Sequence, residues 1–548
     1  MSTVAIDPAA GGKQALSGRL VTMDANFTVI DAGVLYIDAG KIVAVQPAAA
    51  APPNGFAAVT PITVGGTIFP GLIELHNHLS YDALQLWQVP KRYTNRDQWG
   101  GASNPDYRRL VSGPMQLLGP DPDLMPAVVR YVECKALVAG TTTSQGIELF
   151  SNKGARRLYR GNIRNVEETE DPELPGAGTR IGDVDAASAT NFLRALKGKP
   201  CYILHLSEGT DEAARNHFLA LKLSDTEWAL ADSLAGIHCV ALTSEDFAVL
   251  ARYGASMVWS PLSNLLLYGQ TADIKAAKSA GVRIGIGSDW APSGSKNLLG
   301  ELKVAQLANN AAGGVFTDRE LVAMATCTAA EILKWDAALG SLEQGKRPDL
   351  LVIDGDSGDP YQQLLRATER DVKLVLIGGT ARYGEQALVS ALGAQGLEPA
   401  HVAGHDRVLN LRQQTADPVV GQITLAQATD RLQQALANLK QLAEQAEQHG
   451  SPLQRMLAAP EGEVQWGLAL DELEPTGLEL RPRVPLPGQT TPTGPSLLTT
   501  AAAAPLSQVL GPLTLDRLTV PDDPDWLDTI SHEQNLPGWL APGLSELY

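Results

Sequence analysis

Two histidines one residue apart are the part of this chain best suited to chemistry. His76 and His78 close an apolar stretch that begins at Gly71. On an extended strand, residues i and i+2 point to the same face, so both imidazoles can reach one small cation. Neutral imidazoles are good ligands for transition metals. The pair therefore indicates a metal site.

Three further apolar runs end in residues that could join this site. His205 ends one run and is followed three positions later by Glu208, while His238 and Asp289 each end another. An offset of three sends side chains of a regular strand to opposite faces. The chain is therefore expected to turn at residues 206–207, so that His205 and Glu208 face one site.

The elements that would position these residues are those of a barrel. From about residue 71 to 340, short apolar runs alternate with helical patterns, and the mouth of a βα barrel collects residues from several strand ends. The capping boxes at residues 243–246 and 317–320 predict helices over 247–253 and 321–335. An eighth strand, expected between residues 170 and 200, is hidden in a stretch rich in Pro, Gly and Asp. The seven visible strands are predicted over residues 72–78, 141–147, 162–167, 201–206, 234–240, 255–260 and 282–288.

A second, smaller β module is expected on both sides of the barrel in sequence. Short β-prone runs occur at residues 20–45 and again at 350–377, which predicts one discontinuous module. A helix capped by Thr424 and Gln427 carries a leucine stripe that should pack on the body of the protein. Residues 480–505, rich in Pro, Thr and Ala, are expected to be an irregular linker. The predicted domains are a β-sandwich over 1–66 and 340–390, a barrel over 67–339, and a partly helical C-terminal extension over 391–548.

Composition excludes several classes of partner. The 548 residues are 44% hydrophobic and 19% charged, with a net charge of −18, which disfavours nucleic acid. No apolar run is long enough for a bilayer, and the N-terminus shows no secretory signal, so neither membrane nor export is expected. The four cysteines lack CxxC spacing, which is typical of a reduced cytoplasm.

These motifs resemble the amidohydrolase superfamily, in particular the branch of cytosine, guanine, S-adenosylhomocysteine and triazine deaminases or chlorohydrolases. The resemblance extends over about residues 15–390. It implies a (β/α)8 barrel with a discontinuous β-sandwich. The segments that carry it are residues 70–78, 140–143, 205–208, 238–239, 260–264, 287–289 and the return strand within 340–354.

The resemblance also implies roles for individual residues. Glu208 would be the proton shuttle, and His238 would polarise the reacting centre or the attacking water, with Asp289 orienting that water. No lysine lies between residues 154 and 196 to bridge two metals, which favours one ion, although Glu167 or Glu168 could bridge instead. One divalent metal, zinc or alternatively iron, would be held by His76, His78, His205 and Asp289.

The loop after His78 and a few other positions are candidates for substrate binding. Aromatic rings and guanidinium groups would contact a planar or anionic substrate. The alternative for the loop is a packed lid that has no contact with substrate. The candidates are Trp87, Tyr93, Arg96, Trp99, Arg164, Asn264 and Trp290.

The resulting hypothesis is a metal-dependent hydrolase that deaminates a nitrogen heterocycle. Two alternatives stay within the same chemistry: opening of a cyclic amide, as in imidazolonepropionase, which residues 287–290 also resemble, or cleavage of an acyclic amide. A third is a non-catalytic scaffold of the dihydropyrimidinase-related kind, against which the intact set of ligands argues. The expected partner is a small-molecule substrate, and the superfamily resemblance implies a homo-oligomer.

Overall fold

Two parallel sheets supply the strand ends that carry the candidate residues. The computed structural model describes residues 12–100, 104–180, 189–413, 417–460, 462–470 and 504–548. One sheet has the order β5-β6-β9 and the other the order β10-β11-β12-β13-β14, with all neighbours parallel. These strands are β5 (Leu72–Ile73), β6 (Thr141–Ser144), β9 (Arg164–Asn165), β10 (Gly178–Arg180), β11 (Tyr202–Leu206), β12 (Leu234–His238), β13 (Ser256–Trp259) and β14 (Arg283–Ile286).

Backbone hydrogen bonds join the two sheets at both ends. The Ala177 N–H donates to the Val166 carbonyl over 2.8 Å, next to β9 and β10, and the Leu75 N–H donates to the Ile286 carbonyl over 3.3 Å, between β5 and β14. The eight strands thus follow one another in barrel order. Each of the seven predicted ranges contains one observed strand, and the hidden eighth is β10.

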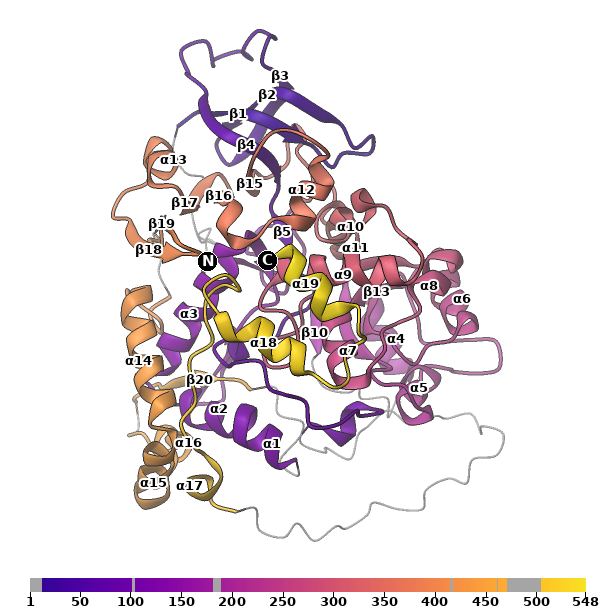
Figure 1. The fold of residues 1–548 in the computed structure, drawn as a ribbon, viewed down its shortest axis with the longest axis vertical. Helices are drawn as coiled ribbons and strands as arrows, with labels where there is room; N and C mark the ends of the chain where they lie inside the picture. The colour runs from indigo at the N-terminus through magenta and orange to yellow at the C-terminus, as the bar shows by residue number, and fades with distance from the viewer. Residues whose placement is uncertain (1–11, 101–103, 181–188, 414–416, 461, 471–503) are drawn as a thin grey trace.

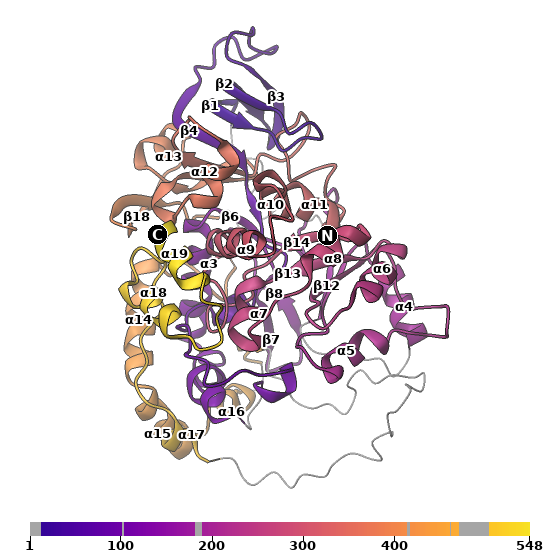
Figure 2. The same cartoon turned by 45° about the vertical axis from the view of Figure 1, so that its right-hand side comes forward.

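Helices follow most of these strands and lie outside them (Figures 1 and 2). The predicted capping boxes are confirmed at the starts of α6 and α10. The helix predicted over 321–335 is divided in two, because Thr326 leaves the helical region with φ −135° and ψ −103°. These helices are α3 (Met125–Val138), α4 (Ala189–Lys197), α5 (Glu212–Leu219), α6 (Ser244–Arg252), α7 (Pro261–Tyr268), α8 (Ile274–Ala280), α9 (Leu298–Ala311), α10 (Asp318–Met324) and α11 (Cys327–Leu333).

The β-prone segments before and after the barrel come together in one nine-stranded sheet, which runs from the top of Figure 1 down toward its left side. Its order is β18-β19-β17-β16-β15-β4-β1-β2-β3, so the return strand β15 pairs with β4. Two of its strands lie beyond the predicted boundary at residue 390. The strands are β1 (Gln14–Val21), β2 (Val29–Asp38), β3 (Lys41–Pro47), β4 (Ile62–Pro70), β15 (Leu350–Asp354), β16 (Val372–Ile377), β17 (Thr380–Gly384), β18 (Glu398–Val402) and β19 (His405–Leu409).

The C-terminal extension packs along the body of the protein. The capping box of Thr424 and Gln427 is present, and Leu432 and Leu436 are buried on the helix α14 that packs against α3, as predicted. The yellow segment with α18 and α19 crosses the middle of Figure 1, where α19 packs against α9. Of the predicted linker over 480–505, all but residues 504 and 505 lie outside the described residues. The elements are α14 (Leu425–Ala437), α15 (Leu439–His449), α16 (Pro452–Leu457), β20 (Trp466–Leu468), α17 (Leu506–Val509), α18 (Pro524–His532) and α19 (Leu540–Leu547).

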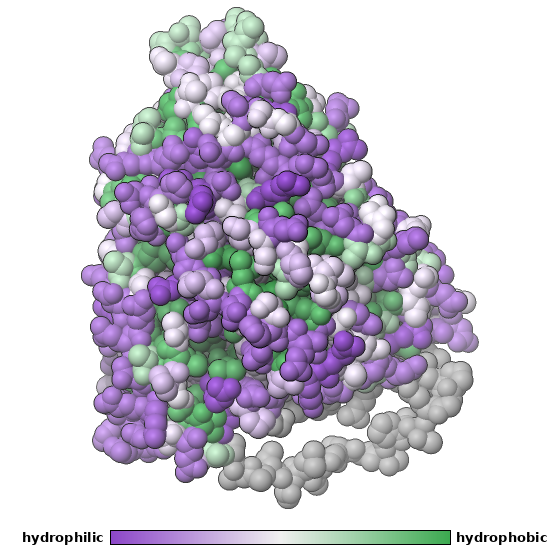
Figure 3. Space-filling view, viewed as in Figure 1, coloured by the Kyte–Doolittle hydropathy of each residue, from purple (hydrophilic) through white to green (hydrophobic). Residues whose placement is uncertain are grey.

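Smaller elements complete the described part of the chain. Hydrophilic side chains cover most of the face seen in Figure 3. Within the described ranges, no helix has both the length and the apolar character needed to cross a bilayer. The remaining helices and strands are α1 (Pro105–Tyr107), α2 (Gly113–Leu118), α12 (Pro360–Arg366), α13 (Gln386–Ala391), β7 (Glu148–Ser151) and β8 (Arg156–Leu158).

Candidate active site

Buried imidazoles and one carboxylate meet at the ends of four barrel strands. One candidate ligand atom from each of His76, His205, His238 and Asp289 lies within 4.8 Å of all the others. His78 lies beside them, with its Nε2 3.4 Å from Asp289 Oδ1 and its ring stacked on that of His205. The structure therefore brings together all five residues predicted from strand ends. His238 belongs to this compact set, whereas the family resemblance implied His78 in its place among the ligands.

The hydrogen bonds of His76 leave a lone pair facing a carboxylate. Gln145 Oε1 accepts the Asn77 N–H over 3.1 Å and lies 3.0 Å from His76 Nδ1, so the proton of the imidazole belongs on Nδ1. His76 Nε2 is then unprotonated, and it lies 3.0 Å from Asp289 Oδ1. Two acceptors this close repel each other unless a cation lies with them. The pair is suited to binding a metal ion.

His238 is oriented in a similar way. Its Nδ1 lies 2.9 Å from Asn264 Oδ1, and the Asn264 amide nitrogen donates to Thr271 Oγ1 over 3.2 Å. Asn264 Oδ1 is thus the acceptor, and His238 carries its proton on Nδ1. Its Nε2 is left as an acceptor that faces the cluster.

Two buried nitrogen atoms of the cluster support the same conclusion. Within the described residues, His205 Nδ1 and His238 Nε2 have no hydrogen-bond partner, although buried polar atoms normally have one. Burial lowers the pKa of His76 and of His205, which keeps both rings neutral. The pKa of Asp289 lies below its ordinary value although burial alone would raise it, so its carboxylate is ionised. Neutral imidazoles and an ionised carboxylate are the forms that bind a divalent metal.

The backbone turns sharply at three of the strand ends. Ser207, His238 and Asp289 have φ values of 53°, 68° and 70°, in the left-handed region that residues other than glycine seldom adopt. Such conformations are concentrated at functional sites. The turn at Ser207 lies within the predicted interval of residues 206–207. It is the change of direction that the offset between His205 and Glu208 requires.

Glu208 is fixed next to the cluster by a tyrosine. The Tyr268 hydroxyl donates to Glu208 Oε1 over 2.8 Å and accepts the Trp99 indole N–H over 2.8 Å. Glu208 Oε2 lies 3.7 Å from both Arg96 Nε and His238 Nε2. The carboxylate is therefore close to the cluster and oriented by a donor from the end of α7.

The pocket beside the cluster is small and largely aromatic. Its open space is about 20 Å³, which is room for one or two water molecules. A heterocyclic substrate therefore requires some of the lining side chains to move aside. A larger cavity of about 580 Å³ lies between α2, α15 and α17, but no residue of the cluster lines it, so the chemistry rather than the size identifies the site. The small pocket is lined by His78, Arg96, Trp99, Tyr107, His205, Glu208, Asp289 and Trp290.

The predicted substrate-binding residues divide into two groups. Arg96, Trp99 and Trp290 line the pocket, and Asn264 contacts His238. Trp87 and Tyr93 are buried in the loop packing instead. Trp87 lies edge-on to Tyr107, the Tyr93 hydroxyl accepts from the Asn104 amide over 3.1 Å, and neither residue lines the pocket. For these two residues the structure fits the packed-lid alternative.

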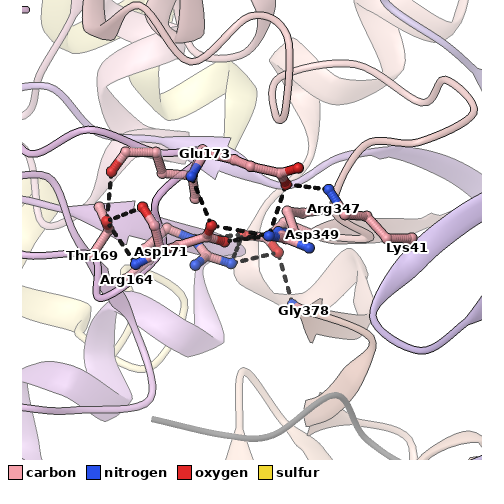
Figure 4. A network of polar contacts seen from close by, with 9 residues as sticks. Lys41, Arg164, Thr169, Asp171, Glu173, Arg347, Asp349 and Gly378 are labelled. Atoms are coloured by element: carbon pink, nitrogen blue, oxygen red, sulfur yellow. Dashed lines mark hydrogen bonds and ion pairs between the residues drawn. The ribbon is translucent and has the colours of Figure 1, made fainter. Parts of the chain in front are cut away.

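Arg164, predicted to bind substrate, is not among the residues that line the small pocket. Arg164 forms an ion pair with Asp349, with its Nη2 3.1 Å from Asp349 Oδ1. Asp349 also accepts the Gly378 N–H over 2.7 Å, which ties the barrel to the nine-stranded sheet (Figure 4). Arg164 therefore has a structural role, because its charge is neutralised away from the pocket.

Three residues at the site were not predicted from the sequence, and one of them is Gln145, whose Oε1 lies 3.0 Å from His76 Nδ1. Tyr107 lines the pocket, and Tyr268 holds Glu208. A signal for Tyr268 was present, since it lies four residues after Asn264 in a helical segment, and residues i and i+4 share one face. Tyr107 comes from a short helix with no such pattern.

Glu167, considered as a bridging ligand, accepts hydrogen bonds from the Gly146 N–H and the Thr179 hydroxyl.

Parallel strands whose ends bring neutral imidazoles, a carboxylate and an adjacent glutamate together define a metal-dependent hydrolase of the α/β class. Comparison with known proteins identifies the family. The model of the amidohydrolase family matches residues 202–382. The chain is 36% identical over 325 residues to the 5-methylthioadenosine/S-adenosylhomocysteine deaminase of Teredinibacter turnerae, covering 53% of this chain and 72% of the relative. It is 27% identical over 381 residues to the enzyme of the same name from Symbiobacterium thermophilum, covering 62% and 84%.

Solved structures agree on the fold. A triazine hydrolase from Arthrobacter aurescens has a TM-score of 0.53 at 20% identity and covers 70% of this chain and 99% of its own. A guanine deaminase from Bradyrhizobium japonicum has a TM-score of 0.51 at 17% identity, with coverage of 69% and 100%. The chain belongs to the amidohydrolase family. It is a metal-dependent hydrolase of carbon–nitrogen bonds other than peptide bonds, which confirms the resemblance found in the sequence.

Proposed function

We propose that this enzyme hydrolytically deaminates a small, planar nitrogen heterocycle with the help of one divalent metal ion. The observation that carries the proposal is the pair formed by His76 Nε2 and Asp289 Oδ1, two acceptors only 3.0 Å apart. The names of the relatives from Teredinibacter turnerae and Symbiobacterium thermophilum support deamination of an aminated ring.

The proposed metal ligands are His76, His78, His205 and Asp289. Three imidazoles with one carboxylate suit zinc, with iron as the alternative. When bound, such an ion supplies a water whose pKa falls to about 7. His238, held by Asn264, turns its Nε2 lone pair toward the cluster, where it accepts a hydrogen bond from the attacking water or the reacting ring.

Glu208 is the proposed proton carrier. It lies next to His238 and receives one hydrogen bond from Tyr268, so one of its oxygens remains directed toward the reacting atoms. In the proposed reaction Glu208 takes one proton from the attacking water and passes it to the ring nitrogen. It then takes the remaining proton of the new hydroxyl group and passes it to the departing amino group. Nitrogen leaves as ammonia, and the ring gains an oxo group.

The side chains that line the pocket indicate the shape and charge of the substrate. Trp99, Tyr107 and Trp290 form a mutual aromatic contact with ring centroids 5.9 to 6.2 Å apart. Aromatic rings in this arrangement favour a flat heterocycle. The buried Arg96 adds a cation that suits an oxo or anionic substituent of that ring.

The proposal includes the organisation of the chain and its setting. The strands at residues 67–339 form one (β/α)8 barrel. The described segments on either side of it form a discontinuous β-sandwich that continues past residue 390 to β19, and the described residues after β19 form the extension. The enzyme is proposed to be a homo-oligomer in the cytoplasm. Its proposed partner is a small-molecule substrate, and it binds neither nucleic acid nor a membrane. The four cysteines, all unpaired, support a reducing compartment.

A substrate screen tests this function. The purified enzyme is incubated with aminopyrimidines, purines, pterins, triazines and cyclic imides, and the products are assayed for ammonia and for ring opening. We expect ammonia from an aminated ring, about one metal ion per chain by elemental analysis, and loss of both in His205→Ala. The matched control is His217→Ala, on helix α5 outside the cluster. A new carboxylate without ammonia would instead establish ring opening, and a metal-free active protein would refute the mechanism.

A further inference from the structure

Two lysines and two aspartates form a buried charged cluster outside the metal site. Lys135 lies on α3 and Lys296 in the loop between β14 and α9, whereas Asp516 and Asp523 belong to the C-terminal extension. The Asp516 carboxylate forms ion pairs with both lysines, and Asp523 Oδ2 lies 2.7 Å from Lys296 Nζ. The side chains of Lys135, Lys296 and Asp516 are each only 1% exposed. We refer to these four residues as the charged cluster.

Lys135 connects the charged cluster to the loop that follows His78. Its Nζ donates to the Asp82 carbonyl oxygen over 2.8 Å. The backbone of Asp516 holds the same loop, because its N–H donates to the Ala83 carbonyl over 3.1 Å. His78 lies only four residues before Asp82, so the C-terminal extension restrains the segment that presents this imidazole.

The loop that follows Asp289 is held from the same place. The Asp82 carboxylate accepts the Ala291 N–H over 2.8 Å, two residues after Asp289. Lys296, an ion-pair partner of Asp516, lies further along this loop. The two loops are therefore tied to each other through Asp82 and to the extension through Asp516.

Charge burial makes Asp516 the residue on which this arrangement depends. A buried ammonium group is tolerated only when it is paired, and Asp516 is an ion-pair partner of both lysines at once. Burial raises the pKa of Asp82 to about 6 despite the opposing effect of the Lys135 ammonium group, so these two groups already interact. Without Asp516, Lys135 would attract the Asp82 carboxylate and weaken its hydrogen bond to Ala291.

We propose that Asp516 is a positioning residue of the metal site, which fixes through Lys135 and Lys296 the two loops that present His78 and Asp289. The C-terminal extension then completes the active site, although none of its described residues contributes a side chain to the lining of the small pocket. This inference rests on the metal binding of the proposed function.

Metal binding by the full-length chain tests the proposal without a substrate. Zinc affinity is measured by competition with a chromophoric chelator, and the ligand geometry is followed in the visible spectrum of the cobalt(II)-substituted protein. The variant is Asp516→Asn, and the matched control is Asp522→Asn, in which the lost carboxylate binds the Ala403 N–H and the Thr519 hydroxyl. We expect a 10-fold to 100-fold loss of zinc affinity and an altered cobalt spectrum in D516N, as for other groups that orient ligands. D522N should stay within about twofold of the wild type.

Two results would overturn the proposal: wild-type affinity and spectrum in D516N, or equal losses in both variants, which would show a general effect of the extension. If D516N does not fold, the zinc affinity of the variant Lys135→Met tests the proposal instead. It removes the donor to the Asp82 carbonyl but leaves Asp516 paired with Lys296. A loss of zinc affinity in K135M supports the proposal, and wild-type binding contradicts it. Absence of metal binding in the wild type would instead refute the proposed function itself.

Discussion

Replacing Tyr268 with phenylalanine tests the proposed proton transfer at a single hydrogen bond. The hydroxyl of Tyr268 donates to Glu208 Oε1 over 2.8 Å in a fully buried setting. A hydrogen bond to a charged group contributes about 1.5–3 kcal/mol, and each 1.36 kcal/mol of transition-state stabilisation is a factor of ten in rate. Tyr268→Phe should therefore lower kcat by about 10-fold to 150-fold, since Glu208 loses the donor that orients it.

The assay is steady-state ammonia release from the substrate found in the screen, with metal content measured in parallel. Tyr268 bonds to Glu208 rather than to a proposed metal ligand, so metal content should not change, and KM should change far less than kcat. Tyr361→Phe is the matched control, because that hydroxyl donates over 3.3 Å to the Phe27 carbonyl, in the region of the nine-stranded sheet. A kcat of Y268F within twofold of the wild type would refute the role assigned to this hydrogen bond.

Three further predictions concern the bound metal, the pH dependence of stability, and the ion pair of Arg164. Removal of the metal by a chelator should abolish ammonia release and zinc should restore it in the wild type, whereas His205→Ala should bind less than about a tenth as much zinc, measured by elemental analysis. Burial raises the pKa of Glu533 to about 7, so the protonated form is favoured on folding and stability is lost as the pH rises from about 4.5 through 7. Glu533→Gln should accordingly gain on the order of 1–2 kcal/mol of unfolding free energy at pH 8 but little at pH 4, measured by urea denaturation; equal effects at both pH values would contradict this. Arg164→Met should cost roughly 3 kcal/mol of stability by leaving Asp349 buried without its partner, with unchanged KM, and a raised KM at unchanged stability would return Arg164 to the pocket.

The order of the elements could be predicted because each strand of the barrel has its own apolar signal. The exception is β10, a three-residue strand in a segment rich in Pro, Gly and Asp. Three residues are too few for a periodic pattern. This strand is stabilised by its pairing with β11, where Gly178 lies opposite Tyr202. That pairing forms only in the folded chain, so the local sequence does not indicate it. Nor could the sequence indicate that the sheet continues past residue 390, since the hairpin of β18 and β19 has alternating but weakly apolar strands.

The reacting groups of the site could be predicted because a barrel gathers the ends of its strands. Glu208 required one added argument, the turn confirmed at Ser207. Arg164 shows the limit of this reasoning. It lies on a strand, but its partner Asp349 is 185 residues away in sequence. Local spacing carries no information about such a partner, and the ion pair decides which way the side chain points.

Two of the three groups that orient the reacting residues come from segments with no chemical motif of their own, whereas Asn264 lies in the segment 260–264 that carries the family resemblance. Gln145 sets the proton of His76 on Nδ1, Asn264 does the same for His238, and Tyr268 directs Glu208. Any of these amides or hydroxyls would be unremarkable in a sequence, because their effect depends on a distance of about 3 Å that only the folded chain establishes. Substituting them should leave every reacting group in place while changing the tautomer or orientation in which it acts. The identity of the chemistry is thus encoded at the strand ends, and its protonation state is set by contacts between distant segments.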